Sequence, residues 1–159
     1  LELERYWITE RVYHHTAPVN LVYSLREALR LIHEEGLERR WARHQQHGDA
    51  LKAGLVAMGL DLLAEEGHRL PMLTSVRVPA GVDDLKVRKA LIGDFNIEIG
   101  GGLGALKGRV WRIGLMGYSA SRANVLLMLS ALEQILRAEG FAVTPGAALA
   151  AAAESYQSA

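Results

Sequence analysis

Arg112 lies in the middle of a largely apolar strand candidate at residues 108–117, where its charge needs a partner. Read with the strand period of two, Trp111, Ile113 and Leu115 face one side and Arg112 faces the other. An unpaired buried charge is strongly destabilising. No acidic residue alternates with Arg112 on this strand, so its partner is either a distant Asp or Glu or the carboxylate or phosphate of a ligand. The pattern leaves both interpretations open, a structural ion pair and an anion-binding site.

The composition is typical of one ordinary globular domain. The 159 residues are 50% hydrophobic and carry a formal net charge of zero, which gives no electrostatic footprint for nucleic acid or an anionic membrane. No apolar run approaches the ~20 residues of a membrane-spanning helix. The absence of cysteine excludes disulfides and thiol chemistry and is compatible with the cytoplasm. Because the chain begins at Leu1 inside a patterned segment, we expect it to be part of a longer protein.

Two helices are expected in the first half of the chain. Thr16 is a candidate N-cap for the first helix, Pro18 suits its first turn, and Gly36 is a candidate C-terminal cap. The second helix is expected over residues 37–58, and its apolar seam includes His44, which we expect to be packed. The first helix carries an apolar stripe at helical spacing, formed by Leu21, Leu25, Ala28 and Ile32.

Short strands are expected to dominate the second half. Helices are predicted after the candidate caps Asp83 and Ser121, and segment 6–13 is predicted to be extended or turn structure. Strands grouped in the second half, together with four helices, predict an α+β fold with a small, largely antiparallel sheet. The four strand candidates are residues 60–64, 73–78, 95–99 and 108–117.

Other chemical motifs have simpler explanations. The glycine-rich loop 100–104 leads into a strand, whereas a phosphate-binding loop of the P-loop or dinucleotide type leads into a helix, so a sharp turn is the better interpretation. His44 and His47 stand three apart, but no third ligand accompanies them at useful spacing, so no metal site is expected. There is no nucleophile elbow.

Taken in order, several segments resemble the class V pyridoxal-phosphate aminotransferases, and among them most closely the alanine–glyoxylate and serine–glyoxylate (serine–pyruvate) aminotransferases. The resemblance covers roughly residues 5–139. Each matching segment is weak alone, and their ordered succession is specific. They are Tyr13–Val19, Tyr23–Leu29, Arg69–Pro71, Val78–Gly81, Ile97–Gly104 and Trp111–Gly117.

The resemblance implies roles for three residues of this chain. Arg112 would bind the α-carboxylate of the amino-acid or keto-acid substrate. Tyr13 and Thr16 would reach across a homodimer to the phosphate of the partner subunit's pyridoxal 5'-phosphate. Neutral hydroxyl donors suit a phosphate, and a carboxylate suits a bidentate guanidinium. A capping role for Thr16 is compatible with the phosphate role.

One part of the family's machinery is missing from the sequence. Its chemistry needs a lysine that forms a Schiff base with the cofactor, and that lysine lies in the large domain upstream of Tyr13. None of the lysines present stands in the family's serine-glycine-threonine-lysine context, so no catalytic residue is predicted in this chain. They are Lys52, Lys86, Lys89 and Lys107.

The resemblance implies the C-terminal portion of a fold type I, aspartate-aminotransferase-like enzyme. Residues 1–35 would end the missing large domain, 36–140 would form the small domain, and 141–159 would be an alanine-rich tail, helical or frayed. The complete enzyme would transaminate alanine or serine with glyoxylate or pyruvate, and the chain alone would be inactive. Two alternatives stay open: another class V enzyme, such as a desulfurase or lyase, and a non-catalytic module for binding or dimerisation.

Overall fold

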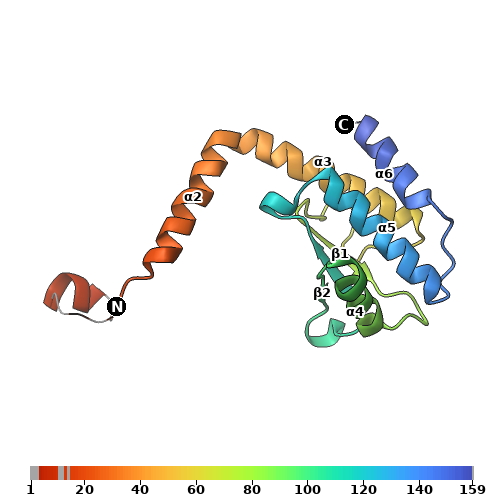
Figure 1. The fold of residues 1–159 in the computed structure, drawn as a ribbon, viewed down its shortest axis with the longest axis horizontal. Coiled ribbons are helices and arrows are strands. Elements are labelled where there is room, and N and C mark those ends of the chain that lie inside the picture. Colours follow the sequence, from red (N-terminus) through yellow and green to blue (C-terminus); the bar gives the residue numbers. More distant parts are fainter. Residues whose placement is uncertain (1–3, 11–12, 14, 159) are drawn as a thin grey trace. The chain divides into compact units, whose positions relative to one another are not determined.

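The computed structural model describes residues 4–10, 13 and 15–158. The chain divides into two compact units, Leu1–Arg40 and Trp41–Ala159 (Figure 1). Helix α3 (Leu37–Ala57) crosses the boundary between them.

The first unit is helical. A π-helical segment η1 covers Arg5–Glu10, so the prediction of extended or turn structure is wrong for residues 6–10. Its aromatic and β-branched residues favour strands only weakly, and there is no clean alternation to reinforce the preference. Helix α2 covers Val19–Glu35 and ends as predicted at Gly36, which has a φ of 80° and donates its N–H to the Ile32 carbonyl. No residue of α2 is buried, and Leu21 of the apolar stripe is 68% exposed.

Helix α3 matches its predicted range, and its seam is buried from His44 onward. Two glycines let neighbouring elements approach it closely. A Cβ at Gly48 would lie 2.3 Å from the Pro71 carbonyl oxygen, and a Cβ at Gly54 would lie 2.4 Å from a methyl carbon of Leu129. A side chain at either position would therefore push the helix away from the core.

The second unit contains the antiparallel sheet that the sequence predicts. Its strands are β1 (Leu73–Arg77), β2 (Gly100–Gly101) and β3 (Val110–Gly114), in the order β1-β3-β2. In this register Arg112 on the central strand pairs with Ser75 on one side and with Gly100 on the other. The α+β class with a small antiparallel sheet is confirmed.

Two of the four predicted strands are corrected. Segment 60–64 runs beside β1 but forms only one isolated bridge, Leu62 with Val76. Residues 95–99 are not a strand, because helix α4 (Asp84–Phe95) ends there with Asn96 in the left-handed conformation at φ 54°. The next N–H, that of Ile97, donates to a carbonyl of α4, so pairing begins only at Gly100.

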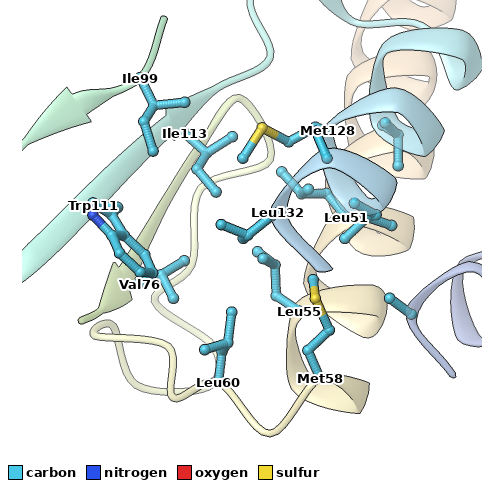
Figure 2. Packing of buried hydrophobic residues seen from close by; sticks show 14 of the residues in the cluster. Leu51, Leu55, Met58, Leu60, Val76, Ile99, Trp111, Ile113, Met128 and Leu132 are labelled. Atoms are coloured by element: carbon cyan, nitrogen blue, oxygen red, sulfur yellow. The ribbon is translucent and has the colours of Figure 1, made fainter. Parts of the chain in front are cut away.

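The core lies between one face of the sheet and the helices α3, α4 and α5 (Arg122–Ala138). Figure 2 shows side chains of α3, α5 and the sheet converging there. The predicted caps of α4 and α5 are confirmed: Asp83 accepts the Lys86 N–H at 2.8 Å, and Ser121 accepts the Asn124 N–H at 3.3 Å. The labelled core residues are Leu51, Leu55, Met58, Leu60, Val76, Ile99, Trp111, Ile113, Met128 and Leu132.

The alanine-rich segment contains a further helix, α6 (Ala147–Gln157). Ala148 and Ala152 are fully buried, since small side chains allow close approach to the core. Farther along, the Tyr156 hydroxyl hydrogen-bonds to His47 Nδ1 at 2.9 Å, and the Arg122 guanidinium lies 4.9 Å from the Tyr156 ring centre. These contacts attach α6 to α3 and α5.

The contact between α6 and α3 should weaken in mild acid. Burial lowers the pKa of His47 below its ordinary 6.5, and the positive charge of Arg43 lowers it further. A histidine whose pKa is depressed in the folded state stabilises the protein above the unfolded-state pKa and loses that stability as pH falls. We expect the urea concentration at the unfolding midpoint to be lower at about pH 5.5 than at about pH 7.5. In the His47→Gln variant we expect this difference to be smaller.

His68→Gln is the matched control, because His68 is exposed in the same unit. If the urea midpoint depended on pH equally in the protein with His47 and in the His47→Gln variant, His47 would not be the group responsible.

Candidate functional site

The alternation of β3 separates its core-facing residues from Arg112. Trp111 and Ile113 are buried among the core residues, whereas Arg112 is half-buried and Gly114 is exposed. The predicted faces of the strand are therefore confirmed, and the Arg112 guanidinium stands on the sheet face opposite Trp111 and Ile113.

The Arg112 side chain is anchored by the neighbouring strand. Its Nε donates to the Gly101 carbonyl oxygen at 2.8 Å. A Cβ at Gly100 would lie 3.2 Å from Nη2 of Arg112, so the guanidinium rests against glycine backbone. Among the residues that the structure describes, no Asp or Glu forms an ion pair with Arg112. The guanidinium in this arrangement suits an anion with two oxygen acceptors, such as a carboxylate.

A second arginine near β2 is neutralised. Arg88 donates from Nε and Nη2 to the two carboxylate oxygens of Asp84 at 2.8 and 2.9 Å. This bidentate pair holds the pKa of the Asp84 carboxyl below its usual range. Arg88 is therefore paired within the chain, whereas no described Asp or Glu pairs with Arg112.

The turn that follows β3 is held by α3. His44 is buried as predicted, and its Nε2 accepts the Gly117 N–H at 3.0 Å. Arg43 donates to the carbonyl oxygens of Gly117 and Ala120 at 2.9 and 2.7 Å. No local pattern in the sequence predicts these contacts, because they join residues more than 70 positions apart.

In the first unit, Tyr13 and Thr16 lie together. The Tyr13 hydroxyl and Thr16 Oγ1 are hydrogen-bonded at 2.5 Å, and both residues are exposed, Tyr13 by 79%. The predicted capping role of Thr16 is wrong, because α2 begins two residues later than a Thr16 cap requires and has Pro18 at its N-cap position. His14, between them in sequence, lies outside the described residues. Two hydroxyls this close can both contact one phosphate group.

The lysines are engaged in ion pairs or exposed. Lys52 pairs with Asp49 at 3.0 Å and Lys86 with Glu139 at 2.8 Å, and the other two are exposed. Within residues 4–10, 13 and 15–158, no group of three or more His, Asp or Glu side chains could hold a metal ion. No helix in the same residues is long and apolar enough to cross a membrane.

A cavity of about 250 Å³ lies near the end of β3 and does not include Arg112. Its lining is mainly apolar and includes Ile97, Leu115 and Met128. Such a lining offers little to a carboxylate, so this cavity is a poor candidate for an anion site.

No established family model matches the chain. The (S)-ureidoglycine–glyoxylate transaminase of Bacillus subtilis is 44% identical over 158 residues, which are 99% of this chain and 38% of the relative. An alanine–glyoxylate aminotransferase of Callithrix jacchus is 48% identical over 128 residues, or 80% of this chain and 31% of the relative.

A solved structure shares the fold. The crystal structure of the ureidoglycine–glyoxylate aminotransferase from Bacillus subtilis matches with a TM-score of 0.89 and 44% identity, covering 98% of this chain and 40% of that one. The chain thus spans less than half the length of the relatives it matches.

Proposed function

Because the chain belongs to the class V pyridoxal-phosphate aminotransferases and matches the C-terminal portion of their members, we propose that the complete protein transfers an amino group from a small amino acid to glyoxylate. Two similar proteins named for glyoxylate transamination support the acceptor. Alanine or serine is the proposed donor, with pyruvate as a further acceptor.

Arg112 is proposed to bind the α-carboxylate of donor and acceptor. The observation that carries this role is a half-buried guanidinium that has a backbone anchor and, among the described residues, no acidic partner. A substrate carboxylate would supply both the missing charge and the matching pair of oxygens. Holding the substrate by this end orients its α-carbon for reaction.

Tyr13 and Thr16 are proposed to bind the phosphate of pyridoxal 5'-phosphate in the partner subunit of a homodimer. Their hydroxyls lie 2.5 Å apart and exposed, which fits two donors to one phosphate. The cofactor, when bound, supplies the electron sink for amino-group transfer. The lysine that holds it would come from the upstream large domain.

Helix α2 is proposed to belong to that large domain as its last helix. It buries none of its residues in this chain, and Leu21, Leu25 and Leu29 are 68%, 58% and 55% exposed. A row of exposed leucines at helical spacing indicates a surface that another structure covers. The upstream domain and the partner subunit are the proposed occupants.

(S)-Ureidoglycine is a second candidate donor. The Bacillus subtilis relative named for it is 44% identical to this chain over 158 residues. The specificity constants for ureidoglycine, alanine and serine with glyoxylate would separate the candidates.

Substitution of Arg112 tests the proposed function for every donor, since each carries an α-carboxylate. Arg112→Lys keeps the positive charge but loses the bidentate pair of N–H donors, and Arg112→Ala loses both. A bidentate, charge-assisted contact is worth about 1.5–3 kcal/mol, so we expect kcat/KM of the complete enzyme to fall about ten- to a hundredfold with normal cofactor absorbance.

Arg109→Ala is the matched control, because Arg109 is exposed just before the same strand. Transamination with an unchanged specificity constant in Arg112→Ala would refute the carboxylate role.

A mixed dimer tests the phosphate role. Tyr13→Phe with Thr16→Ala should weaken cofactor retention while sparing substrate recognition, because each change removes one donor. When the partner subunit lacks the cofactor-binding lysine, the only competent site should keep its donors, because that partner supplies them. With all changes in one subunit, the only competent site lies in the unchanged subunit and should lose its donors, because the changed subunit supplies them.

Tyr23→Phe with Ser24→Ala is the control pair, since both residues are exposed on α2. Equal cofactor affinity in the two arrangements would contradict a contribution from the neighbouring subunit.

A further inference from the structure

An arginine side chain lies against each face of the two-glycine strand β2. A Cβ at Gly100 would lie 3.2 Å from Nη2 and 3.4 Å from Nε of Arg112. A Cβ at Gly101 would lie 3.4 Å from three guanidinium atoms of Arg88. Because successive residues of a strand face opposite sides, the two guanidinium groups flank β2.

The two arginines that flank β2 differ in which of their N–H groups already have acceptors. Arg88 has both oxygens of Asp84 as acceptors. Within the described part of the chain, Arg112 donates to backbone through its Nε–H, at the Gly101 carbonyl oxygen. Side-on pairing through Nε would compete with this hydrogen bond, whereas the outer N–H groups of Nη1 and Nη2 form a parallel pair that matches a carboxylate.

We propose that β2 is a seat for the Arg112 guanidinium, with Gly100 as a positioning residue, and that the substrate carboxylate binds end-on to Nη1 and Nη2. This inference rests on the proposed function and specifies how its carboxylate site is built. An arginine side chain loses considerable rotamer entropy when it is ordered. A seat that orders Arg112 before substrate arrives reduces that cost at the moment of binding.

Backbone conformation does not explain the glycine at position 100. Neither Gly100 nor Gly101 is among the glycines with positive φ, so alanine can adopt either backbone conformation. Gly102 differs, since a Cβ there would lie 2.0 Å from the Leu106 carbonyl oxygen. At position 100 the atoms that an added methyl group meets belong to Arg112 itself.

The test is Gly100→Ala in the complete, cofactor-loaded enzyme. The added methyl group should displace the guanidinium and raise KM for alanine and for glyoxylate about three- to tenfold, with a smaller change in kcat and an unchanged Tm. The inhibition constant of propionate, a plain monocarboxylate, should rise by the same factor. A crystal structure of the variant should show the hydrogen bond from Nε to Gly101 lengthened or lost.

Two other glycine variants serve as controls for Gly100→Ala. Gly93→Ala adds a methyl group where no atom lies within 4 Å and should leave KM unchanged. Gly101→Ala places its methyl group against Arg88 and should raise KM less than Gly100→Ala does. In an Arg112→Ala background, Gly100→Ala should have no further effect on KM, because the seat has lost its occupant.

The outcomes separate this inference from the proposed function. An unchanged KM in Gly100→Ala, beside an impaired Arg112→Ala, would overturn the seat and leave the carboxylate role standing. A Gly100→Ala effect that persists in the Arg112→Ala background, or an equal effect at Gly101, would also overturn it. An unchanged KM in Arg112→Ala would remove the carboxylate role and the inference together.

Discussion

The hydrogen bond from Arg112 Nε to the Gly101 carbonyl joins the central strand of the sheet to its short edge strand and determines where the guanidinium lies. It depends on packing on the opposite face, where Trp111 and Ile113 fix β3 against the helices. The sheet thus buries one face and keeps a charge half-exposed on the other, as antiparallel sheets commonly do. The same charge on the core face would need an acidic partner, as Arg88 needs Asp84.

The groups with proposed roles are binding groups rather than reactive ones. Arg112 in the second unit offers cationic donors, and Tyr13 and Thr16 in the first offer neutral hydroxyls. These chemistries match the two anions of the proposed reaction, a carboxylate and a cofactor phosphate. The division explains how a chain without a candidate reactive lysine can still carry determinants of substrate and cofactor binding.

Helix α6 extends the fold beyond the sheet and its covering helices. Its alanines pack into the core, and Tyr156 joins it to His47 and Arg122. These contacts make the C-terminal segment part of the folded unit.

Local chemistry determined the helix ends at Gly36, Asp83 and Ser121 and the two faces of β3, because capping and side-chain alternation depend on neighbours a few residues apart. Motif order was also enough to indicate the family. The tertiary structure decided the rest. Whether residues 95–99 pair as a strand depended on a competing helix cap, and the acceptor for Arg112 lies on another strand. Both results arise from competition among contacts within the folded chain, which a pattern in one segment does not contain.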